Sequence, residues 1–177
     1  MTDEKEVSLK MLSTALEMEK KGISFYEQAL SKCRNEVGRE IYTMLRDDER
    51  VHIDRIMKIY SSLEAGSDWI EEWKGQKLSH GDLGGLFVDL TKRHGKDFTA
   101  DADDIQALDV GVDFELTAVD FYLKHLERAE DPKEREFLEL MVKEERSHFK
   151  ILDDMRFYLT DPEAWFMEME KSGLDGA

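Results

Sequence analysis

The chain has 177 residues, a length that suits one well-packed domain and is short for two. Its 25 basic and 41 acidic residues give a net charge of −16, which argues against nucleic acid and anionic membranes as partners. Only two prolines occur, and Ala, Leu, Glu, Lys and Met are abundant, so the composition predicts an all-α protein. The start, MTDEKEVSLK, is polar and no long apolar stretch follows, so neither export nor membrane insertion is indicated and we expect a cytoplasmic protein.

The first predicted element is a helical hairpin over residues 8–64. In its first helix, apolar residues recur at alternating three- and four-residue steps, and Glu19 and Tyr26 fall within this buried stripe. In its second helix, Glu49 and His52 occupy the corresponding stripe. Residues three apart share one face of a helix, so these two side chains are expected to point toward the same place.

A glycine-rich connection follows over residues 65–100, with a short helical pattern around Leu86 to Arg93. Its length permits a crossover, which allows a second hairpin to dock beside the first. An up-and-down bundle would not need so long a connection. We expect Trp69 and Trp73, in the same segment, to cover apolar gaps.

A second helical hairpin, over residues 101–160, repeats the first. Two segments return at the same offset of 96 residues: EKKGISFY at 19–26 as ELTAVDFY at 115–122, and DERVH at 48–52 as EERSH at 144–148. The apolar stripe has the same phase in both copies. The repeat therefore predicts four more inward-facing side chains, namely Glu115, Tyr122, Glu145 and His148.

The tail, residues 161–177, begins with Asp161 and Pro162, which can cap and start a further helix. Its apolar and aromatic segment, EAWFMEMEK with Trp165, is expected to cover the core of the bundle, with a partner subunit as the alternative. Residues 1–177 are therefore predicted to form a single domain, a four-helix bundle of two duplicated hairpins with a long crossover.

Four inward-facing carboxylates would place uncompensated charge in a core of low dielectric, which is costly. Protonation relieves part of this cost, but two divalent cations neutralise all four carboxylates and also use both histidines. Carboxylates and imidazoles without a thiolate suit iron, with manganese as the alternative, and suit a paired zinc site less well. The other interpretation, coincidental inward acids in a plain bundle, leaves the charge unexplained. The predicted metal ligands are Glu19, Glu49, His52, Glu115, Glu145 and His148.

Further side chains are predicted to support these ligands. Tyr26 and Tyr122 follow the single acids by seven residues, so their hydroxyls can hold a carboxylate on another helix in place by a hydrogen bond. The alternative is that the tyrosines are redox-active, although packing with one hydrogen bond already accounts for a buried tyrosine. Asp48 and Glu144 are predicted either to accept the free N–H of a ligand histidine from the neighbouring helix or to be solvated. Three other histidines have no counterpart in the repeat and are interpreted as surface or loop residues rather than ligands: His80, His94 and His125.

The segments EKKGISFY and DERVH, with their copies, resemble the rubrerythrin branch of the ferritin-like superfamily, in its form without an iron–sulfur module. The likeness covers both hairpins, whereas the connection at 65–100 and the tail carry little of it. One Glu on each of two helices and a Glu-x-x-His on each of the other two is the ferritin-like di-iron or di-manganese pattern. The resemblance therefore implies a ferritin-like four-helix bundle that binds two iron ions.

The resemblance also implies distinct roles for the ligands. The single acids and the two histidines each bind one metal, whereas Glu49 and Glu145 bridge or chelate both. Full-length rubrerythrins carry a further Glu one turn beyond the third-helix ligand, but this chain has Ala118 there and Gly22 at the repeat position. Redox-linked movement of a metal is therefore not implied for this chain.

The implied activity is that of a non-heme diiron oxidoreductase, which reduces hydrogen peroxide, or dioxygen in the nearest related chemistry. Cys33 is the only cysteine, so we expect a buried, idle thiol, no disulfide framework and no rubredoxin-like four-cysteine centre. The electrons must then come from an external donor protein such as a rubredoxin. Two alternatives remain, namely a ferroxidase for iron storage or delivery and a non-catalytic metal-binding or sensing module. A homodimer is the expected assembly.

Overall fold

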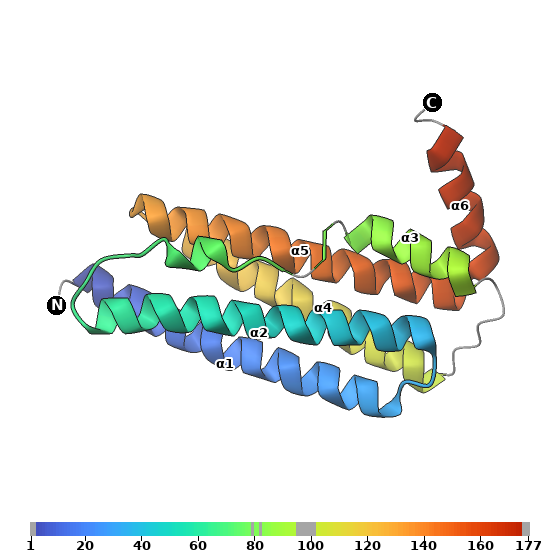
Figure 1. Cartoon of the computed structure of the whole chain (residues 1–177), viewed down its shortest axis with the longest axis horizontal. Helices are drawn as coiled ribbons and strands as arrows, with labels where there is room; N and C mark the ends of the chain where they lie inside the picture. Colours follow the sequence, from blue (N-terminus) through green and yellow to red (C-terminus); the bar gives the residue numbers. More distant parts are fainter. Residues whose placement is uncertain (1–2, 79, 82, 95–101, 175–177) are drawn as a thin grey trace.

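The computed structural model describes residues 3–78, 80–81, 83–94 and 102–174, and among them it contains helices and connections but no strand. Four long helices lie alongside one another as a bundle (Figure 1). The predicted all-α bundle is confirmed. None of the described helices combines the length and the apolar character required to cross a membrane. The long helices are α1 (Asp3–Lys32), α2 (Glu36–Glu64), α4 (Ala102–Leu126) and α5 (Pro132–Thr160).

Each half of the bundle is a helix pair joined by a short polar turn, as the sequence predicts. Asn35 caps α2, because its side-chain oxygen accepts a hydrogen bond from the Gly38 N–H at 2.6 Å. Asp131 caps α5 in the same way, and Pro132 occupies the first turn, where its missing N–H leaves no hydrogen bond unmade. The two turns therefore fix where the second helix of each hairpin begins.

The outer boundaries of the hairpins differ slightly from the prediction. α1 begins at Asp3, earlier than the predicted residue 8, because its polar first turns extend the helix beyond the apolar stripe. The second hairpin is predicted from residue 101, which lies outside the described residues, and α4 begins at Ala102.

The connection between the halves is a crossover that returns along the bundle between α2 and α5 (green in Figure 1). After α2 it contains a short 3₁₀ helix, η1 (Glu72–Gly75), and then α3 (Leu83–His94), which packs against α5. The predicted short helix is therefore present, but it begins at Leu83 rather than Leu86. Residues 79, 82 and 95–100 of this segment lie outside the described part of the chain.

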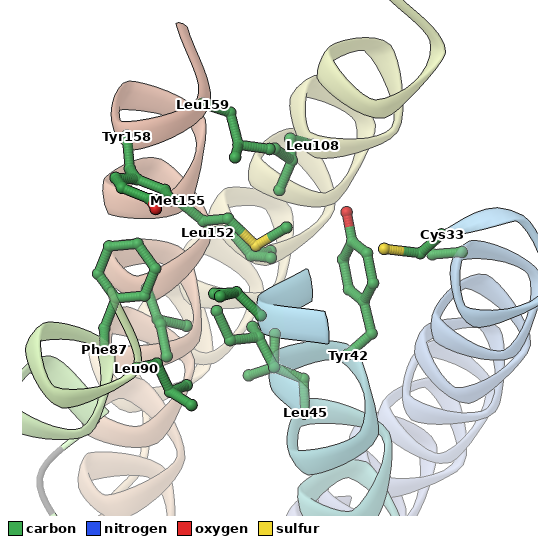
Figure 2. Close-up of a cluster of buried hydrophobic side chains, with 14 of the residues drawn as sticks. Cys33, Tyr42, Leu45, Phe87, Leu90, Leu108, Leu152, Met155, Tyr158 and Leu159 are labelled. Carbon is green, nitrogen blue, oxygen red and sulfur yellow. The ribbon is translucent and has the colours of Figure 1, made fainter. Parts of the chain in front are cut away.

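Two apolar clusters fill the bundle, and the predicted ligands lie between them. The cluster at the α1–α2 turn includes the buried thiol of Cys33, as expected, and side chains from α3 (Figure 2). The other cluster lies toward the opposite end and includes Leu12, Ile56, Ile59, Phe137 and Met141. The close packing of both clusters excludes water along the bundle axis on either side of the ligands.

The three tryptophans cover apolar surface, as predicted. Trp69 and Trp73 from the crossover pack on Phe137, with ring centroids 5.9 and 5.6 Å apart. Trp165 belongs to α6 (Pro162–Leu174) and packs on Phe87 of α3 at 5.4 Å. The first turns of the tail therefore cover the chain's own core, while the rest of α6 projects from the bundle (Figure 1).

Gly66 allows a test of backbone strain at the end of α2. Its φ is +84°, in a region that residues with a side chain rarely adopt, whereas the φ of Gly75 is not positive. A Cβ added at either position would meet nothing within 4 Å, so the two sites differ in backbone conformation and not in packing. Gly66→Ala is expected to lower the free energy of unfolding by about 1 kcal/mol. Gly75→Ala, measured alongside by urea denaturation, is expected to lower it less. Equal losses from the two substitutions would contradict the assignment of strain to Gly66.

Candidate metal centre

All six predicted ligands meet in the middle of the bundle, where each is at most 2 % exposed. Helices α1 and α4 contribute one acid each, and helices α2 and α5 each contribute a Glu-x-x-His pair. The side chains form two donor groups, and the donor atoms within each group lie within 4.8 Å of one another. The first donor group is Glu19, Glu49, His52 and Glu145, and the second donor group is Glu49, Glu115, Glu145 and His148.

In each donor group a histidine Nδ1 faces three carboxylates. The Nδ1 of His52 lies 3.4 Å from Glu19 Oε2, 3.3 Å from Glu49 Oε2 and 3.2 Å from Glu145 Oε1. The Nδ1 of His148 lies 3.6 Å from the other oxygen of Glu49 and 3.3 Å from the other oxygen of Glu145. It also lies 3.7 Å from the remaining acid, on α4. Glu49 and Glu145 therefore offer one oxygen to each donor group, which is the geometry of bridging carboxylates.

Several donor atoms of the cluster are buried without a hydrogen-bond partner among the described residues. An unmade hydrogen bond to a buried polar atom costs about 1–3 kcal/mol, and more for a charged group. Two cations placed in the two donor groups would satisfy these atoms, so the residues present fit a dinuclear metal site. The atoms are both oxygens of Glu49, Glu115 Oε2, Glu145 Oε1 and His148 Nδ1.

The pKa values in the cluster show how strongly the buried charges compete. Burial, together with the charges of Glu49 and Glu145, raises the pKa of Glu19 well above its ordinary value, and burial raises the pKa of Glu115 to about 8. Burial also disfavours ionised Glu145, but the charge of His52 and the contacts of both histidines hold the pKa of Glu145 below its ordinary value. The pKa of each histidine lies well above its ordinary value, because the surrounding carboxylates outweigh the opposite effect of burial. The cluster therefore takes up protons unless another positive charge is present.

The two tyrosines hold the single acids across the bundle. Tyr26 of α1 donates to Glu115 Oε1 on α4, and Tyr122 of α4 donates to Glu19 Oε1 on α1. Burial raises the pKa of both phenols well above the ordinary value, so they remain neutral donors. The predicted contact with a carboxylate on another helix is confirmed, and it leaves one oxygen of each single acid facing its donor group.

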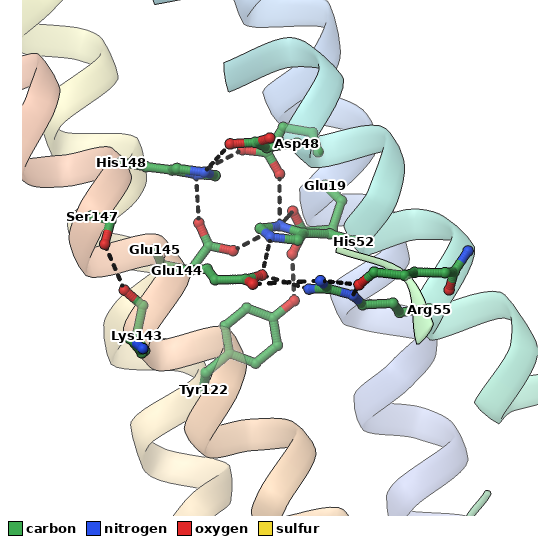
Figure 3. A network of polar contacts seen from close by, with 12 residues as sticks. Glu19, Asp48, His52, Arg55, Tyr122, Lys143, Glu144, Glu145, Ser147 and His148 are labelled. Atoms are coloured by element: carbon green, nitrogen blue, oxygen red, sulfur yellow. Dashed lines mark hydrogen bonds and ion pairs between the residues drawn. The ribbon is translucent and has the colours of Figure 1, made fainter. Parts of the chain in front are cut away.

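Asp48 and Glu144 hold the outer nitrogens of the histidines, as one of the two interpretations predicts (Figure 3). The Nε2 of His148 lies 3.1 Å from Asp48 Oδ2, and the Nε2 of His52 lies 3.0 Å from Glu144 Oε2. Each acid comes from the opposite hairpin. The contacts fix the orientation of both rings, so that Nδ1 is the nitrogen that faces the carboxylates.

Sequence reasoning missed two residues behind these acids. Arg55, which is 2 % exposed, donates to Glu144 Oε2 at 2.5 Å and to the Gln76 carbonyl at 2.6 Å. His80 lies in a loop and outside both donor groups, as predicted, but its Nε2 contacts Asp48, a contact with the site that the sequence did not reveal. Neither residue belongs to the repeat, so the repeat could not reveal them.

Of the other two histidines outside the repeat, only the side chain of His125 is described, and it belongs to neither donor group. His125 is partly exposed on α4 and packs against Phe121, with ring centroids 4.7 Å apart. His94 is the last residue of α3, and its side chain lies outside the described residues. His125 therefore matches its interpretation as a surface residue, and it lies outside both donor groups.

Gly22 lies one turn after Glu19 and leaves room for the bridging carboxylate. A Cβ at this position would lie 3.3 Å from Glu49 Cδ and 3.0 Å from the Phe114 ring. The corresponding residue in the second half, Ala118, is 2 % exposed. The two halves of the site therefore differ at this position, which has no side chain in the first half and a buried methyl group in the second.

Comparison of the chain with protein-family models, with curated proteins and with solved structures finds no match. The functional conclusion therefore depends on the residues and geometry described above.

Metal binding is expected to release protons. With a pKa of about 8, Glu115 is mostly protonated at neutral pH when no cation is bound, and the raised pKa values of Glu19 and both histidines act in the same direction. A cation must displace these protons, so the affinity for Mn(II) should increase as the pH rises through the neutral range. Isothermal titration calorimetry in two buffers of different ionisation enthalpy should give different heats. Equal heats would count against proton displacement.

Gly22→Ala is expected to weaken metal binding, because the added Cβ must displace either Glu49 or Phe114. Gly111→Ala is the matched control: its Cβ would lie 3.1 Å from Phe25 and Leu152, which is similarly tight, and its nearest contacts are apolar side chains. Both variants should lose some stability, whereas only Gly22→Ala should reduce the affinity for Mn(II). A similar loss of affinity in both would show that the effect is general overpacking.

Proposed function

We propose that this protein is a ferritin-like, rubrerythrin-type non-heme diiron oxidoreductase, which reduces hydrogen peroxide, or dioxygen, with electrons from an external donor. The observation that carries the proposal is the pair of buried carboxylates, Glu49 and Glu145, each of which offers one oxygen to each of two donor groups. A bundle of two hairpins with a long crossover is the wiring that such centres use.

Iron is the proposed metal, with manganese as the alternative. The donor set contains four carboxylates and two imidazoles and no thiolate, which suits these ions. Two divalent ions also balance the charge of four carboxylates, which a single ion does not. The single acids on α1 and α4 and the two histidines would each hold one ion, while the bridging acids would hold both.

Two ferrous ions, when bound, supply the two electrons that convert hydrogen peroxide and two protons into two molecules of water. The chain's own residues prepare the site for this reaction. The apolar clusters on either side limit access of bulk water, and Tyr26 and Tyr122 each hold one carboxylate oxygen by a hydrogen bond. Asp48 and Glu144 hold the histidine rings in place, so the donor geometry is set before a substrate arrives.

The electrons that restore the ferrous state are proposed to come from a separate protein, such as a rubredoxin. Cys33 is the one cysteine of the sequence, and it is buried in the apolar cluster beside Tyr42 (Figure 2). A single thiol cannot form a four-cysteine iron centre. The homodimer expected from the sequence remains a prediction.

Anaerobic loading with Fe(II), followed by stopped-flow mixing with peroxide and separately with dioxygen, tests the proposal. We expect two irons per chain and oxidation that is much faster with peroxide. Faster oxidation by dioxygen, with iron accumulating in the protein, would instead indicate a ferroxidase. Two irons that react with neither oxidant would indicate a metal-binding or sensing module, and no stoichiometric binding would reject the diiron site.

Glu49→Gln tests whether the bridging position is where iron binds. The substitution keeps the shape of the side chain but removes the charge that both donor groups share, so iron affinity should fall by more than about 100-fold. Glu40→Gln removes an exposed acid from the same helix and should leave the stoichiometry unchanged. Retention of two tightly bound irons by Glu49→Gln would place the metals elsewhere.

A further inference from the structure

Each of the two acids that hold the ligand histidines is itself held by a nitrogen donor. Glu144, which accepts from His52, receives two hydrogen bonds from the guanidinium of Arg55, at 2.5 and 3.4 Å. Asp48 Oδ2, which accepts from His148, also forms a hydrogen bond with the Nε2 of His80. The two halves of the site therefore have the same order of contacts: ligand histidine, acid, nitrogen donor.

The two nitrogen donors do not have the same origin. Arg55 lies on α2, three residues after His52, and the repeat offset of 96 residues would place its counterpart at residue 151. That residue is Ile151, which is 1 % exposed and packs in the apolar cluster. The second hairpin thus lacks the cation that the first one has, and a residue of the crossover fills the vacant role.

The geometry of the His80 ring fits this role. Its Nδ1 lies 3.2 Å from the Gly81 carbonyl oxygen, and its Nε2 faces a carboxylate oxygen of Asp48, so both ring nitrogens point at acceptors. The side chain is 9 % exposed, which is low for a loop residue. A ring held at both nitrogens has one orientation, and it can therefore hold Asp48 in one orientation as well.

We propose that His80 is a positioning residue for the metal in the second donor group, where it does for Asp48 and His148 what Arg55 does for Glu144 and His52. The proposal rests on the proposed function, because it assumes that the two donor groups bind metal. It assigns the crossover a part in the site: without His80, Asp48 is free to turn away, and the ring of His148 loses its fixed orientation.

A cavity explains why this contact matters. The space between the crossover and α5 has a volume of about 880 Å³, and its wall includes Arg55, Gln76, His80 and Glu144. The outer contacts of both ligand histidines therefore end at the same cavity. If the His80 side chain is removed, water from this cavity can take its place beside Asp48. Arg55 would keep its contact with Glu144, because its guanidinium is also held by hydrogen bonds to the Gln76 carbonyl.

The test uses the full-length protein with ¹⁵N-labelled histidine, in the wild type and in three variants. His80→Ala removes the proposed contact, His80→Arg replaces it with the donor that Arg55 uses, and His125→Ala is a control at a partly exposed histidine. In the metal-free protein, NMR signals of the Nε2–H groups report the two ligand histidines separately. Their assignment comes from His52→Gln and His148→Gln variants.

We expect His80→Ala to change the His148 signal and to leave the His52 signal unchanged. In His80→Arg, the His148 signal should return to its wild-type position. In protein loaded with Co(II), release to a chelator should then become biphasic, because one of two ions leaves on the order of tenfold faster. His125→Ala should match the wild type in both measurements.

An unchanged His148 signal in His80→Ala would overturn the proposal, and so would equal changes in both histidine signals, which would show general loosening. Unchanged release of Co(II) would overturn the effect on the metal. If the wild type binds no metal, the proposed function fails. In that case the NMR signals still decide whether His80 positions His148.

Discussion

The structure depends on one constraint: four carboxylates lie at the same level of an apolar core, and their negative charge must be balanced there. Bulk water has little access to them, because each of these carboxylates is at most 2 % exposed and apolar clusters lie on either side of the site. The histidines and the tyrosines each compensate part of this charge, and a pair of cations would compensate the rest. Removal of a histidine or a tyrosine from this site would leave charge or polar atoms buried without a partner, which costs more free energy than the same change at the surface.

This constraint explains why the polar contacts are arranged in layers. Each single acid gives one oxygen to a tyrosine and keeps the other for its donor group. Each histidine gives Nε2 to an outer acid and keeps Nδ1 for the donor group, and each outer acid meets a nitrogen donor. The atoms left without partners are concentrated at the centre, where a cation would bind. The outer contacts fix the orientation of the central side chains, as the supporting residues of a metal site would.

The sequence predicts the six central side chains better than the residues that surround them. The helices and the inward position of the six predicted ligands follow from periodicity, because a polar residue in the apolar stripe of a helix faces the core. The duplication then shows which inward acids belong together. Arg55 and His80 could not be predicted in this way, because one lacks a counterpart in the second half and the other lies in a segment without periodicity. The start of α3 at Leu83 was missed for the same reason, since short helices between glycines have weak signals.

The contacts that the tyrosines and the outer acids make with the predicted ligands cross between the two hairpins. Tyr26 and Asp48 of the first half hold predicted ligands of the second, and Tyr122 and Glu144 of the second half hold predicted ligands of the first. Such exchange is the pattern of a two-fold symmetric interface, here within one chain. It follows that neither hairpin completes its own half of the site, because each depends on the tyrosine and the outer acid of the other copy. The equivalent outer acids, Asp48 and Glu144, differ, so these positions are constrained by the contact with the opposite copy and not by identity between the copies.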